Sequence, residues 1–227
     1  MADKRARVRE LASEFTRRGN QLGWFEALYA EAGADNSAIP WADMVPNPRL
    51  VEFWQTHPLE AVGKRALVIG SGLGDDSEQL AAWGFQTTAF DISPTAIAAT
   101  KKRYLNTKAE YLVADLFHPP AEWQRAFDFV LEVHTVQAFT GDLRARSIAQ
   151  IAEFVAPGGR LLVIARGRAE DEPQGQGPPW PLTRDEIDGF HRAGLEEESF
   201  EDYADPEPPW VRRFRALYRR VSTPVVK

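Results

Sequence analysis

Three glycines at alternate positions follow directly on a short apolar run. Residues 66–69 are all apolar, Gly70, Gly72 and Gly74 come next, and a helical stretch follows. Glycine lets the backbone turn tightly and leaves N–H groups bare where any Cβ would collide with a ligand. The pattern predicts a strand, a glycine turn and a helix, with a ligand site at the carboxyl end of the strand. A tight turn that needs glycine for its geometry alone is the alternative.

Short apolar runs and helical stretches alternate through the rest of the chain. We predict further strands at residues 86–91, 110–114, 127–133 and 160–165, and helices at 94–104, 142–155 and 183–192. Such alternation is typical of a parallel sheet covered by helices on both faces. Strands at 195–203 and 211–221 have only a proline-rich link between them, so they must run antiparallel. The chain is therefore predicted to be α/β, with a doubly wound, mostly parallel seven-stranded sheet of Rossmann-like type and a C-terminal antiparallel hairpin.

The second predicted strand ends in an acid, Asp91. It lies 91 − 70 = 21 residues after the first glycine of the turn. An acid at this distance is placed to accept hydrogen bonds from both ribose hydroxyls of a bound nucleoside. An Asx turn or part of a helix cap is the alternative for Asp91.

The glycine spacing and two further acids distinguish between nucleoside cofactors. Dinucleotide-binding chains usually have G-x-G-x-x-G and place a pyrophosphate at a helix N-terminus. Here the third glycine comes one residue earlier, and Asp75 and Asp76 would repel a pyrophosphate but attract a cation such as an amino group. S-adenosylmethionine, which carries an ammonium and a sulfonium, fits better than a nicotinamide cofactor. Complementing the helix dipole alone is the alternative for both acids.

The N-terminal residues differ in character from the rest. Apolar residues recur at helical spacing in residues 5–18, a second short helix is predicted at 49–54, and the connector between them is unusually aromatic. A chain of 227 residues fits one α/β domain, since such domains run to about 200–250 residues. We predict a single domain, 1–227, in which 1–62 form a helical and aromatic lid segment and 63–227 the cofactor-binding core.

Composition excludes several kinds of site. The chain has no cysteine, and its four histidines lack metal-ligand spacing, so a disulfide framework, a cysteine nucleophile and a metal site are not expected. No apolar run approaches the roughly 18–20 residues of a membrane span, and the N-terminus has no hydrophobic signal segment. A cytoplasmic protein without membrane attachment is the expectation.

Together these features resemble the class I S-adenosylmethionine-dependent methyltransferases, over roughly residues 65–220. Residues 68–74 look like the family's first motif, residues 157–159 like the turn before its fifth strand, and the closing hairpin like its last two strands. The family often has an acid where this chain has Val68. The resemblance implies contacts with S-adenosylmethionine, and with its product S-adenosylhomocysteine, by Gly70, Ser71, Gly72, Gly74, Asp91, Ile92, Ser93, Asp115 and Leu116.

A narrower resemblance is to the thiopurine and plant-type halide/thiol methyltransferases. It rests on Trp24 and Trp41 in the aromatic segment, on Glu132 in the fourth strand and on the Pro178-Pro179 loop. It implies that the aromatic segment folds over the cofactor and the acceptor. It also implies that Trp24, Trp41 and Glu132 bind the cofactor and that Pro178-Pro179 lie on the acceptor side. The spacing between the two tryptophans is longer here than in that group.

The residues permit methyl transfer without a general base. A soft anion such as a thiolate or halide needs little beyond desolvation and alignment. Aromatic walls from Trp24, Trp41 and Phe139 would exclude water and face a sulfonium cation, and core packing is the alternative for Trp41 and Phe139. His134, just past the fourth strand, is the candidate catalytic base if an acceptor O–H or N–H must lose a proton. An ordinary hydrogen-bonded histidine is the alternative.

Arginines gather near the C-terminus, but the expected partner is a small molecule. In a strand, Arg213, Arg215 and Arg219 share one face, which we expect to be a solvated edge. With 27 basic and 33 acidic residues and a net charge of −6, nucleic acid is not an expected partner. We predict an enzyme (EC 2.1.1), a monomer or weak homodimer, that methylates a small thiol or other soft nucleophile. O- or N-methylation, nicotinamide-dependent oxidoreduction and a non-catalytic cofactor-binding role remain alternatives.

Overall fold

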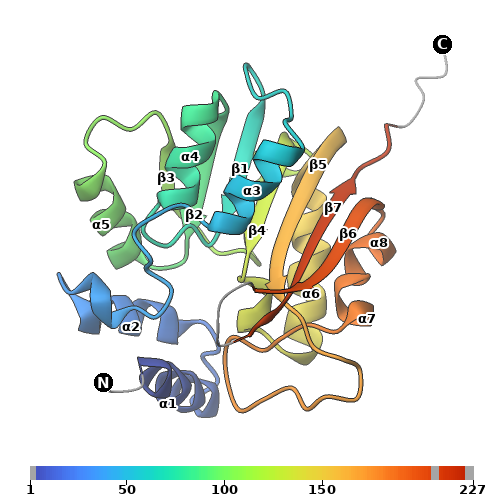
Figure 1. Ribbon diagram of the computed structural model, residues 1–227. Helices are drawn as coiled ribbons and strands as arrows, with labels where there is room; N and C mark the ends of the chain where they lie inside the picture. Colours follow the sequence, from blue (N-terminus) through green and yellow to red (C-terminus); the bar gives the residue numbers. More distant parts are fainter. Residues whose placement is uncertain (1–3, 206–209, 223–227) are drawn as a thin grey trace.

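A single sheet forms the centre of the computed structural model, which describes residues 4–205 and 210–222. Within these ranges the seven strands lie in the order β3-β2-β1-β4-β5-β7-β6 (Figure 1). The strands are β1 (Arg65–Ile69), β2 (Gln86–Asp91), β3 (Glu110–Val113), β4 (Phe127–Val133), β5 (Val155–Arg166), β6 (Glu196–Ala204) and β7 (Arg212–Arg219). The first five are parallel, and β7 runs antiparallel to β5 and β6. The predicted fold class is confirmed.

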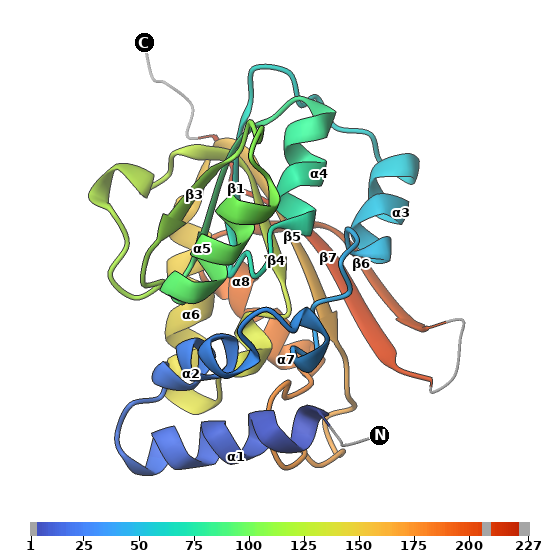
Figure 2. The same cartoon turned by 90° about the vertical axis from the view of Figure 1, so that its left-hand side faces the viewer.

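Helices cover both faces of this sheet (Figures 1 and 2). One face carries α3 (Pro48–Thr56), α4 (Asp75–Trp83) and α5 (Pro94–Arg103). The other carries α6 (Gly141–Phe154), α7 (Arg184–Ile187) and α8 (Gly189–Arg192). The helix predicted at 183–192 is thus two short helices that meet at Asp188. None of the helices in the described ranges combines the length and the hydropathy that crossing a bilayer requires.

The strand order reverses between β1 and β4. From β1 the chain moves outward to β2 and β3, and it then returns to place β4 and β5 on the other side of β1. In an open parallel sheet, such a reversal leaves a crevice at the carboxyl ends of the two central strands. The topology therefore positions a ligand site at the ends of β1 and β4.

Local sequence explains why the elements begin where they do. Ser93 is the N-cap of α5 and accepts a hydrogen bond from Ala96 N at 3.0 Å, and Pro94 takes the first helical position, as predicted. Thr183 forms a capping box with Glu186 at the start of α7. Both caps satisfy backbone donors that a helix start leaves without an intrahelical partner.

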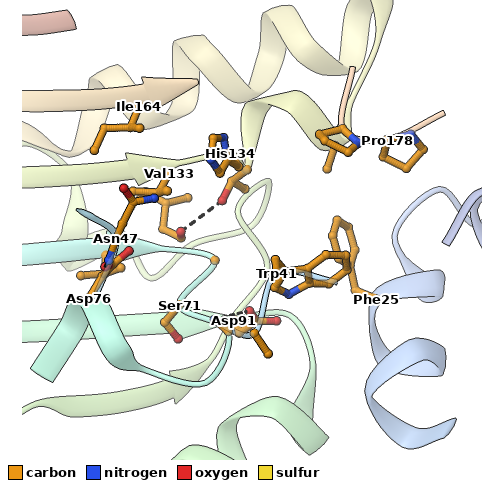
Figure 3. A pocket seen from close by; sticks show the side chains of 18 of the residues that line it. Phe25, Trp41, Asn47, Ser71, Asp76, Asp91, Val133, His134, Ile164 and Pro178 are labelled. Atoms are coloured by element: carbon orange, nitrogen blue, oxygen red, sulfur yellow. Dashed lines mark hydrogen bonds between the residues drawn. The ribbon is translucent and has the colours of Figure 1, made fainter. Parts of the chain in front are cut away.

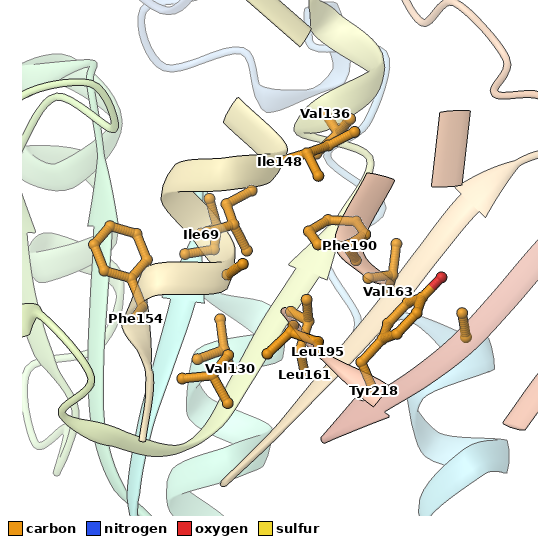
Figure 4. Close-up of a cluster of buried hydrophobic side chains, with 14 of the residues drawn as sticks. Ile69, Val130, Val136, Ile148, Phe154, Leu161, Val163, Phe190, Leu195 and Tyr218 are labelled. Atoms are coloured by element: carbon orange, nitrogen blue, oxygen red, sulfur yellow. The ribbon is translucent and has the colours of Figure 1, made fainter. Parts of the chain in front are cut away.

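The largest core cluster lies between the sheet and α6 to α8 (Figure 4). Its side chains come from alternate positions of the central strands and from one stripe of α6, and its fully buried members include Val130, Phe154, Leu161, Val163 and Phe190. Tyr218 on β7 is also buried, and its hydroxyl donates to Ile187 O at 3.0 Å. The Tyr218 hydroxyl, which would otherwise be buried without a hydrogen-bond partner, is thereby satisfied.

The expectation of a solvated edge on β7 is wrong. β7 lies between β5 and β6, so β6 is the edge strand. Arg215 is only 5% exposed, forms an ion pair with Glu201 at 2.6 Å and donates to Arg49 O at 3.0 Å. Alternation in one strand shows which residues share a face, but it does not show which strands flank it. The proline-rich link at 206–209 lies outside the described residues.

The N-terminal helices α1 (Lys4–Arg17) and α2 (Gly23–Ala32) lie side by side across the carboxyl ends of the parallel strands (Figures 1 and 2). Glu26 ties α2 to the start of α5, because it accepts hydrogen bonds from Ser93 Oγ and Thr95 Oγ1 at 2.6 Å each. Trp24 is 3% exposed and packs with residues of α1. The two N-terminal helices thus form a small apolar core between them.

Candidate active site

A cavity of about 800 Å³ opens at the carboxyl ends of β1, β2, β4 and β5. Small-molecule sites usually measure about 300–1,000 Å³, so this one has room for a nucleoside cofactor and a small acceptor together. The N-terminal segment and the loop with Pro178 complete the wall. In Figure 3, Ser71 and Asp91 lie on one side of the cavity, and His134 and Pro178 lie on the opposite side.

The glycine turn forms part of the cavity wall. Gly70 has φ 60° and Gly72 has φ 53°, a region that side chains rarely adopt. A Cβ on Gly70 would lie 2.6 Å from Thr135 Oγ1, so this position also lacks room for one. Ser71 lines the cavity, whereas its hydroxyl oxygen is buried and has no hydrogen-bond partner among the described residues. A turn of bare backbone fits a ligand that approaches the main chain closely at this point.

Asp91 joins the turn to the end of β2. Its two carboxylate oxygens accept hydrogen bonds from Gly72 N at 3.0 Å and Ser93 N at 2.9 Å. The second bond closes an Asx turn, so the alternative considered for this acid is present alongside its position on the cavity. Burial raises the pKa of Asp91 to about 6. Its free lone pairs would accept from ribose hydroxyls.

Asp75 and Asp76, at the start of α4, have different surroundings. Asp75 is held by Arg103, whose Nη2 and Nη1 lie 2.6 and 2.8 Å from its two oxygens. Asp76 accepts from Asn47 N at 2.6 Å, and burial raises its pKa to about 6. Both line the cavity. Asp75 is therefore neutralised within the protein, whereas Asp76 faces the cavity without a cationic partner among the described residues.

The acidic residues gather at one end of the cavity. Five carboxylates line it there: Asp43, Asp75, Asp76, Asp91 and Asp115. Asp115 follows β3 and accepts from Phe117 N at 2.9 Å. Acids around a cavity stabilise a cationic ligand and destabilise a polyanion. This end fits a nucleoside that carries ammonium and sulfonium groups.

An aromatic wall faces the same cavity. Trp41 is 40% exposed, and its Nε1 donates to Tyr29 Oη at 2.8 Å. Phe25 and Phe139 line the cavity with ring centroids 6.4 Å apart. The sequence reasoning missed Phe25 and Tyr29, although their spacing of four on a helix was a signal that they share a face. Phe139 is both buried in the core and exposed to the cavity, so its two interpretations are compatible.

The structure brings most of the predicted site residues together. Nine line the cavity: Trp41, Gly70, Ser71, Gly72, Asp91, Ile92, Asp115, Leu116 and His134. Their contact with a cofactor stays a prediction.

Four predicted contact residues are instead placed behind the cavity wall. They are Trp24, Gly74, Ser93 and Glu132. Trp24 stacks on Phe25, which does line the cavity, with ring centroids 3.8 Å apart. The Cα of Gly74 packs so closely that a Cβ would lie 2.6 Å from Thr100 Cγ2.

Ser93 and Glu132 are used inside the protein. Ser93 is fully buried as the cap of α5. Glu132 is fully buried, its Oε1 accepts from Val136 N at 2.9 Å, and its Oε2 has no partner among the described residues. Burial raises the pKa of Glu132 to about 7. Both residues support the loops that form the wall, which sequence spacing alone does not distinguish from direct contact.

His134 lines the cavity, but both of its ring nitrogens are engaged. Nδ1 lies 2.9 Å from Gln137 Oε1, which also accepts from Arg166 N at 2.7 Å. Gln137 Oε1 is therefore an acceptor, so Nδ1 carries the proton and Nε2 is the unprotonated nitrogen. Nε2 lies 3.3 Å from Arg213 Nη1, a permanent donor. Burial, and then the Arg213 guanidinium, lower the pKa of His134 to about 4.

Basic residues gather at the end of the cavity near His134. Arg5, Arg166 and Arg213 line it there, with one acid, Asp205. Asp205 pairs with Arg213 at 2.8 Å. Sequence reasoning did not single out Arg166, because only the pairing of β5 with β7 brings it beside Arg213. The cavity thus has an acidic end and a basic end.

Known proteins are similar to this chain in sequence. Residues 66–159 match the methyltransferase domain family. A probable thiol methyltransferase 2 of Arabidopsis thaliana is 29% identical over 175 residues, which cover 74% of this chain and 71% of that protein. A ubiquinone biosynthesis O-methyltransferase of Xanthomonas euvesicatoria pv. vesicatoria (strain 85-10) is 30% identical over 127 residues, 54% of this chain and 51% of that protein.

Solved structures share the fold. A protein studied in the conversion of a disulfide bond into a thioacetal group during echinomycin biosynthesis superposes with a TM-score of 0.70 at 22% identity, over 88% of this chain and 93% of that one. A SAM-dependent methyltransferase from Methanosarcina mazei superposes with a TM-score of 0.63 at 16% identity, over 79% of this chain and 100% of that one. At these identities the likeness shows the fold alone. The matched family model and both sequence relatives are methyltransferases, and the family match covers residues 66–159 of this chain.

Proposed function

We propose that the chain, as an S-adenosylmethionine-dependent methyltransferase, methylates a small thiol or another soft nucleophile. The observation that carries this proposal is the state of His134. Its Nδ1–H is used by Gln137 and its Nε2 faces Arg213, so the imidazole is poorly placed to take a proton from an acceptor. A thiol ionises near neutral pH without such help, whereas an alcohol does not.

The residues at the acidic end would hold the cofactor. Asp91 would accept from the ribose hydroxyls, Asp115 lies where the resemblance implies the adenine, and Asp76 would face the ammonium group. When bound, S-adenosylmethionine supplies an electrophilic methyl group on its sulfonium. The aromatic wall of Phe25 and Trp41 would exclude water and stabilise a cationic centre.

The basic end would hold the acceptor. His134, Ile164 and Pro178 line this end, so apolar surface lies beside the positive charge of its arginines. A thiolate loses its hydration shell on entering such a site and becomes more reactive, and nearby guanidinium groups favour the ionised form. The thiol methyltransferase relative from Arabidopsis supports the same acceptor class.

O-methylation is the second candidate, because the Xanthomonas relative is an O-methyltransferase of ubiquinone biosynthesis. An alcohol or phenol would need a base, and His134 is the only histidine that lines the cavity within the described residues. Its lowered pKa leaves it unprotonated at neutral pH but weakly basic. This candidate therefore requires Arg213 to move away from Nε2.

A competition assay tests the proposal. The chain is incubated with methyl-labelled S-adenosylmethionine and equal amounts of thiophenol and phenol, and the products are identified by mass spectrometry. We expect the thioether to dominate and the rate to follow the thiolate fraction as pH rises. Preferential formation of the methyl ether, abolished by His134→Ala, would contradict the proposal and favour O-methylation.

A further inference from the structure

We infer that Arg166 binds a carboxylate on the methyl acceptor, so that the acceptor is a small thiol that also carries an acid group. The thiol rests on the proposed function, whereas the carboxylate rests on the position of the Arg166 side chain, its lack of a partner and the charge around it.

Arg166 is the last residue of β5, at the basic end of the cavity. In the β5–β7 ladder it pairs with Arg213, so the two side chains share one face of the sheet. Both line the cavity, as do His134 and Ile164. The backbone of Arg166 is fixed, because its N–H donates to Gln137 Oε1 and its C=O accepts from Gln137 Nε2. The guanidinium is therefore presented from a rigid strand end.

Across residues 4–205 and 210–222, the Arg166 side chain makes no hydrogen bond, ion pair or ring contact. Neighbouring arginines are all engaged: Arg213 pairs with Asp205 at 2.8 Å, and Arg215 with Glu201 at 2.6 Å. Burial, with Arg5 and Arg213 nearby, lowers the pKa of Arg166 to about 10. A half-buried cation beside two like charges destabilises the empty protein. A purely structural arginine would be expected to have a partner.

The charge at this end of the cavity fits a single negative group. Asp205 forms an ion pair with Arg213 and none with Arg166, so the charge of the Arg166 guanidinium is available to one anionic group. The chain as a whole carries −6, which makes a basic cavity end a local feature rather than a consequence of composition. A guanidinium presents two parallel donors, which match the two oxygens of a carboxylate.

Matched acceptors test the assignment. We compare kcat/KM for 3-mercaptopropionate and for its methyl ester, which lacks the charge, in the native chain and in Arg166→Met. We expect the native chain to prefer the acid by about 10–100-fold, the range for a lost charge-assisted bond, and the variant to lose that preference, so that its acid and ester rates become similar. Arg212→Met is the control, because Arg212 pairs with Asp202 outside the cavity.

A binding measurement separates this inference from the proposed thiol chemistry. Propionate has the carboxylate but no sulfur, and calorimetry in the presence of S-adenosylhomocysteine should show it binding to the native chain and not to Arg166→Met. Propionate binding without methylation of any thiol would support the carboxylate site and contradict the thiol function. Equal rates for acid and ester, with no propionate binding, would overturn the assignment of Arg166 even if thiols are methylated. Since Arg166 has no partner to lose, the variant should melt at or above the native temperature.

Discussion

Replacing Glu132 by glutamine should stabilise the folded chain, and by an amount that depends on pH. Glu132 is fully buried, and only one of its oxygens has a hydrogen-bond donor among the described residues. Raising the pKa from the ordinary 4.5 to about 7 means that ionising the buried group costs about 3 kcal/mol of folding free energy. Glutamine keeps an acceptor for Val136 N but carries no charge.

The sign follows from the two protonation states. The folded chain holds the Glu132 proton more tightly than the unfolded chain, so this residue's contribution to stability is complete below pH 4.5 and is lost as pH rises through about 7. His134 acts in the opposite direction: its lowered pKa gives stability that is present above pH 6.5 and lost as pH falls through about 4. The native pH profile contains both effects, but the difference between native chain and variant isolates Glu132.

Urea unfolding at pH 4.5 and pH 8 measures this difference. The free energy of unfolding of Glu132→Gln, minus that of the native chain, should increase by about 3 kcal/mol between the two pH values. Glu122→Gln is the control, because it removes the same charge from an exposed position. A difference that stays constant with pH would refute the reasoning, since Glu132 would then be ionised at no cost.

Three further predictions concern the site. Asp91→Ala should weaken binding of S-adenosylhomocysteine by about 1–3 kcal/mol in calorimetry, since the ribose loses a charged acceptor, and an unchanged affinity in a folded variant would remove Asp91 from the site. His134→Ala should reduce the rate of thiol methylation by much less than the roughly 10²–10⁴-fold typical of a lost acid–base catalyst. Trp41→Ala should reduce this rate more, because it admits water to the cavity. Steady-state rates in the opposite order would contradict the prediction. Amide hydrogen exchange in residues 20–48 should slow when S-adenosylhomocysteine is added. The slowing should be larger in Glu26→Gln, which frees α2 from α5. Equal protection with and without ligand would show that the segment is a fixed wall.

The fold was largely predictable because the signals for it are local. Each element is indicated by a few neighbouring residues. Examples are the glycine turn after the apolar run, the Ser93-Pro94 helix start and the two C-terminal strands with no helix between them. The position of β7 was not predictable in this way. Its insertion between β5 and β6 depends on strand pairing across more than forty residues, and no local sequence pattern predicts such a pairing.

The site was predictable where residues follow strand ends. Asp91 and Ser71 reach the cavity because the carboxyl ends of parallel strands meet at one edge. Contact and support were not distinguishable, because Glu132 sits at the same edge but points into the interior. No sequence motif pointed to Arg166. Its proposed role rests on the absence of a side-chain partner, and that absence is known only once the side chains around it are placed.

Calorimetric titration of the purified chain tests the central claim most directly. S-adenosylmethionine and S-adenosylhomocysteine should each bind at one site, and NAD should not bind, because the acids around the glycine turn repel a pyrophosphate and attract a cation. Binding of NAD, with no heat from either methionine-derived nucleoside, would contradict the account.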